Sequence, residues 1–174
     1  GSTSAYDESL HLLDESAATF SRLGAALESN VAFGLRSVIP LMKYRSTWSQ
    51  LSYLTEGSEV WKRYLTLLAR GIGGPGIRGV TELWPSQIRV LESGILNSNH
   101  STVVRLPTSG GKTRIAEMAI IDVLQRIPDA KCVFVAPYRA LAFEVERTLG
   151  ATLGDLGFRV SSVIGSYETD DFED

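Results

Sequence analysis

Apolar residues recur three and four positions apart in the first part of the chain, which is the period of an amphipathic α-helix. The first such pattern runs from Tyr6 to Leu27 and predicts one helix. Similar patterns predict helices over 59–70 and over 31–44, where Pro40 is expected to kink or divide the helix. We therefore expect residues 1–70 to form a small helical unit.

The pattern then changes at a glycine-rich stretch, Gly71-Ile-Gly-Gly-Pro-Gly76. It formally matches the dinucleotide fingerprint G-x-G-x-x-G, but that fingerprint must follow a strand and open a helix. Here it follows a helical pattern and contains a proline, so we interpret residues 71–80 as a linker. The aromatic residues before it, Trp48, Trp61 and Tyr64, are interpreted as core side chains.

Beyond the linker, short β-rich runs alternate with helical patterns. Helices are predicted from Trp84-Pro85 to about Leu96, over 112–127 and over 138–149, and strands over 102–106, 131–136 and 158–164. Apolar strands joined by segments long enough for crossovers are typical of a parallel sheet covered on both faces. The sequence thus predicts an α/β fold over residues 81–174, preceded by the all-α unit.

Composition supports a folded protein outside the membrane. The 174 residues are 44% hydrophobic and 21% charged, which suits one domain with an appendage and excludes wholesale disorder. No run approaches the roughly 20 apolar residues that a membrane span needs, and no secretion signal opens the chain. We expect a soluble protein of the cytoplasm, or of the nucleus in a eukaryote. The opening Gly-Ser without a Met indicates a trimmed fragment.

The distribution of charge and of metal-binding side chains adds little evidence about function. The net charge is −3, yet residues 31–150 carry a local excess of +6, a surface that could meet a polyanion. Cys132 alternates with Phe134 in a predicted strand and is interpreted as a buried apolar residue. His11 and His100 lie far from any spacing suited to a metal and are interpreted as surface residues.

The most informative segment is Leu106-Pro-Thr-Ser-Gly-Gly-Lys-Thr113, between a predicted strand and a predicted helix. Glycines let backbone N–H groups converge on a phosphate chain, and the following helix N-terminus adds partial positive charge. The Lys112 ammonium can reach the β- and γ-phosphates, and the Thr113 hydroxyl can hold Mg²⁺. The strict pattern requires glycine where this chain has Leu106, so the general expression fails at one position.

That departure is itself informative, because the form P-T-x-x-G-K-T resembles motif I of superfamily 2 helicases, which tolerate another residue there. Upstream, Trp84-Pro-Ser-Gln87 resembles the Q motif. Downstream, Ala136-Pro-Tyr-Arg-Ala-Leu141 resembles motif Ia. Together with Glu144 and Ile164-Gly-Ser-Tyr167, these segments are most similar to the superkiller-like branch of the DEAD/DEAH-type helicases.

The resemblance covers about residues 80–174 and implies the first part of a RecA-like, P-loop motor domain. It implies ATP and Mg²⁺ as cofactors and single-stranded or partly duplex DNA or RNA as partner. Catalytic roles fall on Lys112 and Thr113, with Thr113 as the magnesium ligand. The other implied contacts are nucleotide binding by Gln87, Thr108, Ser109, Gly110 and Gly111, and nucleic-acid binding by Pro137 and Arg139.

Asp170-Asp171-Phe-Glu-Asp174 does not fit motif II, whose acids end an apolar strand, and is interpreted as a solvated acidic loop. The chain therefore stops before motif II and lacks the second motor domain and the arginine finger, so residues 1–174 alone are expected to be inactive. The full-length protein would couple ATP hydrolysis to unwinding or translocation. Two alternatives stay open: a double-strand translocase or restriction-type motor, and a protein-interaction fragment whose helical unit docks a partner.

Overall fold

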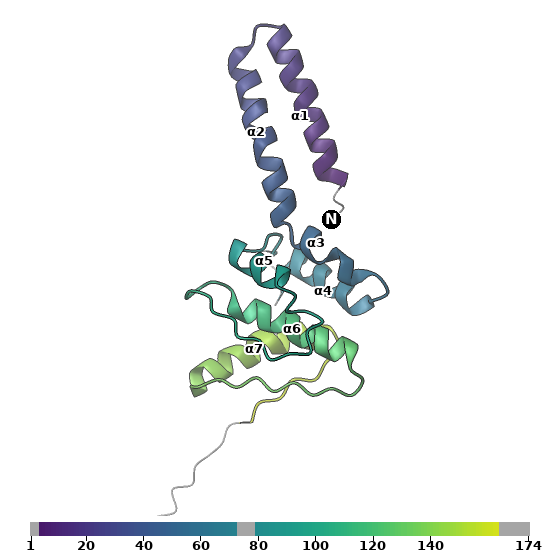
Figure 1. Ribbon diagram of the computed structural model, residues 1–174, viewed down its shortest axis with the longest axis vertical. Helices are drawn as coiled ribbons and strands as arrows, with labels where there is room; N and C mark the ends of the chain where they lie inside the picture. Colours follow the sequence, from purple (N-terminus) through teal and green to yellow (C-terminus); the bar gives the residue numbers. More distant parts are fainter. Residues whose placement is uncertain (1–3, 73–78, 164–174) are drawn as a thin grey trace, which may run out of the picture.

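The structure, a computed structural model, describes residues 4–72 and 79–163. Its first two helices, α1 (Ser4–Arg22) and α2 (Ala26–Arg45), pack side by side as a hairpin that extends away from the rest of the molecule (Figure 1). The turn between them contains Gly24 at φ +72°, a conformation that favours glycine. Polar contacts also join the two helices. The Lys43 ammonium lies 2.7 Å from Asp7 Oδ1, and Arg36 pairs with Asp14.

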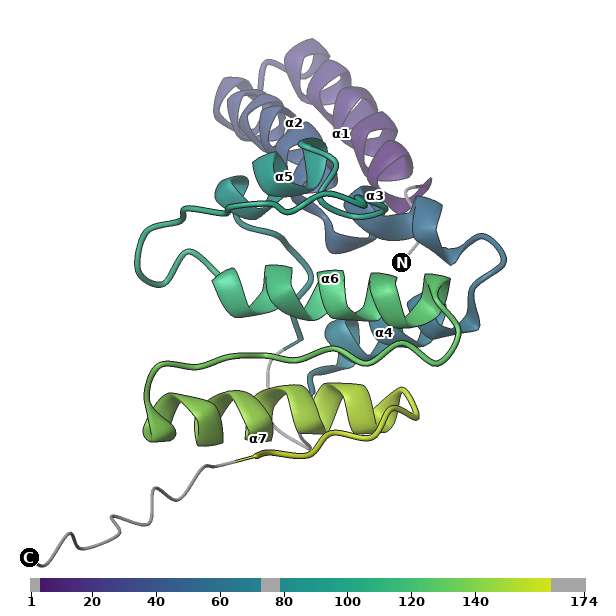
Figure 2. The same ribbon diagram turned by 60° about the horizontal axis from the view of Figure 1, so that its bottom comes forward.

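The remaining helices form the body of the molecule (Figure 2). Their bounds are α3 (Thr47–Leu51), a short 3₁₀ turn η1 (Ser52–Thr55), α4 (Glu59–Arg70), α5 (Pro85–Glu92), α6 (Lys112–Arg126) and α7 (Arg139–Asp155). The Ser58 hydroxyl caps α4 by accepting from the Trp61 N–H at 3.2 Å. Pro85 occupies the first turn of α5, where its missing N–H carries no cost.

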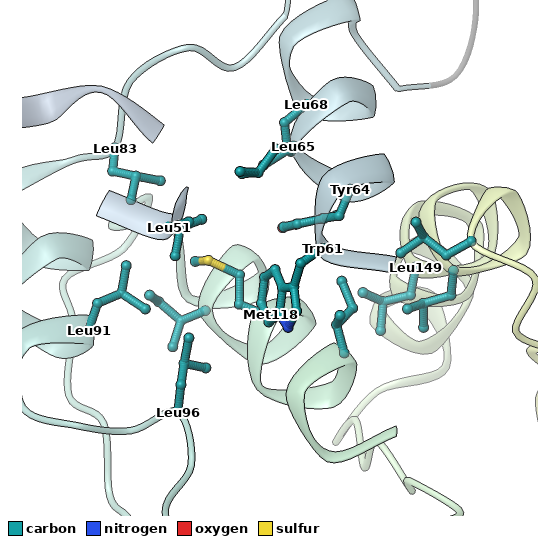
Figure 3. Close-up of a cluster of buried hydrophobic side chains, with 14 of the residues drawn as sticks. Leu51, Trp61, Tyr64, Leu65, Leu68, Leu83, Leu91, Leu96, Met118 and Leu149 are labelled. Atoms are coloured by element: carbon teal, nitrogen blue, oxygen red, sulfur yellow. The ribbon is translucent and has the colours of Figure 1, made fainter. Parts of the chain in front are cut away.

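One buried apolar cluster joins all five of these helices (Figure 3). Trp61 and Tyr64 of α4 are 2% and 0% exposed and meet edge to face, with ring centroids 5.6 Å apart. They pack in this cluster with Leu51 of α3, Met118 of α6 and Leu149 of α7. The helix α6, which follows the glycine-rich turn, therefore packs in the same buried cluster as α4, the helix before the linker. Two of the three aromatic residues interpreted as core, Trp61 and Tyr64, are buried, and Trp48 packs partly buried against the cluster.

The predicted parallel sheet is not formed among the described residues. Segments 102–106, 131–136 and the described part of 158–164 run as irregular chain, and the β-type pairing in the described ranges is an isolated bridge between Ser46 and Glu82. Val103 and Val133 are 83% and 86% exposed. A strand needs a neighbouring strand to pair with and other elements to cover its faces. Both depend on residues distant in sequence, so an apolar pattern alone does not supply them.

The structure corrects three predicted helix ends and shows that Pro40 does not divide its helix. The pattern from Tyr6 to Leu27 is broken by the turn at Gly24, so Leu27 belongs to α2. That helix continues through Pro40, which is exposed, so water can hydrate the carbonyl freed by its missing N–H. The helix expected to reach Leu96 ends at Glu92, followed by Gly94 at φ +78°. The helix α7 instead extends beyond its predicted end, to Asp155.

The interpretation of Cys132 as a buried residue is wrong, because its side chain is exposed; among the described residues, no strand pairs with its segment. His11 and His100 are exposed, as expected. No group of three metal-binding side chains occurs in the described residues. Among those residues, no helix is both long and apolar enough to cross a bilayer. Most of the glycine-rich stretch (73–78) and the acidic residues 170–174 lie outside the described residues.

Candidate nucleotide-binding site

The glycine-rich segment forms a tight turn that leads directly into α6. The Gly110 N–H donates to the Pro107 carbonyl at 3.0 Å, and Gly111 lies at φ +77° just before the helix begins at Lys112. A Cβ on Gly110 would meet the Pro107 carbonyl oxygen at 2.9 Å. The turn therefore requires glycine at 110 for space, and at 111 for backbone conformation as well.

Ser109 also has positive φ, +65°, which is uncommon for a residue with a side chain. Residues held in this region cost about 1–3 kcal/mol each and cluster at ligand-binding turns. The turn that Gly110 and Gly111 form directly after Ser109 holds this residue in its strained conformation. Thr108 and Ser109 are both exposed, so their backbone groups lie at the molecular surface.

Gln87 ties α5 to this turn. Its Oε1 accepts from the Trp84 N–H at 2.9 Å, which closes the first turn of α5, and its Nε2 donates to the Gly111 carbonyl at 3.2 Å. A Cβ on Gly111 would lie 2.1 Å from that Nε2. The side chain is 4% exposed, so both ends of the amide are used inside the protein. The Ser86 hydroxyl adds a longer contact to the Gly110 carbonyl at 3.4 Å.

The Lys112 ammonium folds back over the turn that precedes it. Its Nζ donates to the carbonyl oxygens of Pro107 and Leu106 at 2.9 and 3.2 Å. The cationic group thus lies over the turn, at the N-terminus of α6, where the helix dipole also favours an anion. Thr113 follows in the first turn of α6 and is exposed.

An ion pair that was not predicted from the sequence lies within α6. Arg114 Nη1 donates to both carboxylate oxygens of Glu117, at 2.8 and 2.7 Å, and Glu117 is 1% exposed. Burial raises the pKa of Glu117, although Arg114 opposes the shift. The pKa of the neighbouring Tyr64 phenol is raised as well, first by burial and then by the charge on Glu117. A spacing of three residues on a predicted helix is the signal that indicates such a pair.

The two residues predicted to bind nucleic acid are distant in sequence from the glycine turn but lie on the same side of the molecule. Arg139 opens α7, and Pro137 lies just before it; both are exposed. In Figure 2, α6 and α7 run alongside each other and begin at the same end. The structure therefore brings Gln87 together with Gly110, Gly111 and Lys112, and places Pro137 and Arg139 at the same end of the neighbouring helix.

A glycine turn leading into a helix that starts with Lys-Thr is the arrangement of P-loop nucleotide-binding proteins. Comparison with known families gives a more specific result: the DEAD/DEAH box helicase family matches residues 84–173. The chain belongs to this family. Its matched part is accordingly part of a RecA-like domain, since that is the fold of the family's motor.

Individual relatives agree with the family. The Hachiman protein HamB of Bacillus cereus is 40% identical over 90 residues, 52% of this chain and 8% of that protein. The ATP-dependent DNA helicase Hel308 of Methanocaldococcus jannaschii is 35% identical over 97 residues, 53% of this chain and 8% of its own length. The ATP-dependent DNA helicase Hel308 of Pyrococcus horikoshii is 37% identical over 94 residues, which are 54% of this chain and 13% of that protein. The chain thus spans about a tenth of these relatives, and no solved structure matches it.

Proposed function

We propose that this chain is the ATP-binding part of a nucleic-acid-dependent ATPase that couples hydrolysis to strand unwinding or translocation. The observation that carries the proposal is the turn from Gly110 to Thr113 at the start of α6, in a chain of the DEAD/DEAH box helicase family. In phosphoryl transfer the protein mainly positions the phosphates and neutralises developing charge. The proposed roles therefore concern positioning and charge.

The turn suits a phosphate chain. The lack of side chains at Gly110 and Gly111 lets the turn close tightly against Pro107 and Gln87 at the start of α6, and Lys112 already holds its ammonium against two carbonyl oxygens of the turn. Phosphate oxygens carry more charge than carbonyls and make stronger hydrogen bonds to an ammonium. We assign the backbone of 108–111 and Lys112 to the phosphates and Thr113 to Mg²⁺, which when bound would neutralise charge on the β- and γ-oxygens.

Gln87 is proposed to read the adenine edge, with a donor and an acceptor on one amide. Because both ends of that amide are bonded within the protein, adenine contact requires exchange of the bonds to Trp84 and Gly111. Without adenine, the same side chain supports the turn through its bond to Gly111. Occupancy of the base site and the conformation of the phosphate turn are therefore coupled through Gln87.

Pro137 and Arg139 are proposed to contact the nucleic-acid backbone. Their exposure at the start of α7 and the local excess of +6 over residues 31–150 support a phosphate contact. We further propose that segments 102–106, 131–136 and 158–164 form parallel strands of the complete RecA-like sheet. Two of the named relatives are DNA helicases, which favours DNA over RNA as the strand.

We also propose that the chain is divided into a helical unit (1–70), a linker (71–80) and a motor part (81–174). We further propose that the protein belongs to the superkiller-like branch and is located in the cytoplasm. Residues 1–174 alone are expected to bind ATP without hydrolysing it, because no motif II carboxylate is recognised in the sequence. A double-strand translocase remains the second candidate for the whole protein, and unwinding assays on the full-length protein distinguish it.

Titration with a fluorescent ATP analogue tests the proposed site. We expect saturable binding that unlabelled ATP displaces and that Mg²⁺ strengthens. Thr113→Ala should remove most of the Mg²⁺ effect. The matched control is Thr66→Ala, at an exposed hydroxyl that bonds its own helix at 2.9 Å, and it should leave the effect unchanged. Absence of saturable binding, or the same Mg²⁺ effect in both variants, would contradict the assignment.

A further inference from the structure

The helix α2 has an inner side that packs against α1 and an apolar outer side. Its inner side faces α1, with Ala32 buried and Ser29 bonded to the Ala17 carbonyl at 3.2 Å. Its outer side carries a row of exposed residues that we call the outer stripe. The outer stripe consists of Leu27, Val31, Gly34, Leu35, Val38 and Met42, spaced as one helical face.

The outer stripe is not covered by the described part of this chain. Leu27 is 73% exposed, Val31 55% and Val38 45%. The hairpin extends away from the body, so the other helices do not reach along its length (Figure 1). Contiguous exposed apolar patches of this kind mark interaction sites.

We propose that the outer stripe binds the outer stripe of a second copy of this chain, with the two α2 helices antiparallel. The order of the residues in the outer stripe supports an antiparallel pair. Reversing the stripe about the point between Gly34 and Leu35 exchanges Leu27 with Met42 and Val31 with Val38. A two-fold axis at that point therefore places an apolar residue opposite an apolar residue at every step.

The glycine at the midpoint of the outer stripe also supports the pairing of two helices. Glycine inside a helix costs about 1 kcal/mol relative to alanine, so an exposed helical glycine needs a reason. A Cβ on Gly34 would meet no atom within 4 Å, so the fold of this chain does not supply that reason. At the crossing point of two helices, a missing side chain lets the backbones approach closely.

The charges at the two ends of α2 favour the antiparallel direction. Glu28 lies at the tip end of α2, whereas Lys43 and Arg45 lie at its base. An antiparallel pair brings Glu28 of each copy to within about one helical turn of Arg45 of the other, and it does so twice. A parallel pair would instead place Arg45 beside Arg45. The chemistry of the stripe and its ends thus favours a second copy in the antiparallel direction.

The mass of the chain in solution tests this pairing. Sedimentation equilibrium should show a dimer at about 50 µM that dissociates on dilution, which is ordinary micromolar affinity. Val31→Glu with Val38→Glu should raise the dissociation constant at least about a hundredfold, because the pairing would bury carboxylates. The matched control is Leu12→Glu on α1, a residue 56% exposed that lies outside the stripe, and it should leave the dimer intact.

Disulfide trapping tests the direction of the helices. In a Cys132→Ser background, Val31→Cys chains mixed with Val38→Cys chains should form a crosslinked heterodimer, because these positions face each other. Each variant alone should crosslink far less. Circular dichroism confirms that the variants remain helical. A monomer at all concentrations, a dimer unaffected by the paired Glu substitutions, or preferential crosslinking of each variant with itself would overturn the proposal.

Discussion

The side-chain amide of Gln87 donates to the carbonyl oxygen of Gly111 at 3.2 Å, joining α5 to the glycine turn before α6. Because Gln87 is 4% exposed, we expect the loss of this bond to affect both the fold and the proposed site. Gln87→Glu would set a carboxylate against a carbonyl, so two acceptors would meet without a proton. The cost of such an unsatisfied buried group is about 1–3 kcal/mol. We expect the free energy of unfolding to fall by this amount, and affinity for an ATP analogue to fall with it.

Gln50 offers the control for this variant, because its Nε2 also donates to a backbone carbonyl, that of Tyr44, at 2.7 Å in a solvent-exposed setting. Gln50→Glu should change stability by less than about 0.5 kcal/mol, since water replaces the lost bond. Urea denaturation measures both variants. Equal losses would show that the Gln87 bond contributes nothing beyond an ordinary surface contact.

Gly111 provides the second prediction. Gly111→Ala would place a Cβ 2.1 Å from Gln87 Nε2 and hold alanine at φ +77°. We expect a loss of stability of about 1–3 kcal/mol and loss of nucleotide binding. Gly150→Ala in α7 is the opposite case, since nothing lies within 4 Å of its Cβ and the residue is helical. It should stabilise the chain by about 0.5–1 kcal/mol. Thermal unfolding that moved both variants in the same direction would contradict the turn geometry.

The pair of Arg114 and Glu117 provides the third prediction. Arg114→Met leaves the Glu117 carboxylate buried without its cation, and breaking a buried pair typically costs about 3–5 kcal/mol. The double variant with Glu117→Leu removes both charges and should recover most of that loss. Chemical denaturation of the two single variants and the double variant measures the coupling. Additive losses would show that the pair is not coupled.

The same pair predicts a pH dependence. The pKa of Glu117 is raised in the folded chain, chiefly by burial, so the folded state holds its proton more tightly than the unfolded state does. Stability therefore falls as the pH rises from the ordinary carboxyl pKa through the raised one. The loss in Arg114→Met should shrink at low pH, where Glu117 is neutral, and Glu117→Gln should remove this dependence. A loss that is independent of pH would contradict the burial of an ionisable group here.

Arg139 provides the fourth prediction, measured in the full-length protein. A phosphate contact carries no sequence information, so Arg139→Ala should weaken binding to all single strands about equally. The slope of the logarithm of affinity against that of salt should become shallower by roughly 0.7. Arg147→Ala, at an exposed position further along α7, is the matched control. An unchanged slope would leave Arg139 as a residue of the helix surface.

The sequence predicts this molecule well where the determinants are local. The helix α4 coincides with its predicted range, because its apolar period, its Ser58 cap and the glycine after Arg70 act within one element. The glycine turn at 110–111 is likewise a local property. The sheet depends on which backbones pair, and Cys132 is exposed because its pairing is absent among the described residues. The Gln87–Gly111 bond joins residues 24 positions apart, which no periodicity indicates.

The most direct test of the nucleotide site compares two lysine variants in one titration with a fluorescent ATP analogue. Lys112→Ala removes the ammonium that lies over the turn, and losing a charge-assisted phosphate contact of about 1.5–3 kcal/mol should weaken binding roughly ten- to a hundredfold. Lys62→Ala removes an exposed ammonium paired with Glu59 on α4 and should bind like the unaltered chain. If Lys112→Ala binds the analogue as tightly as Lys62→Ala does, the turn before α6 is not the phosphate site.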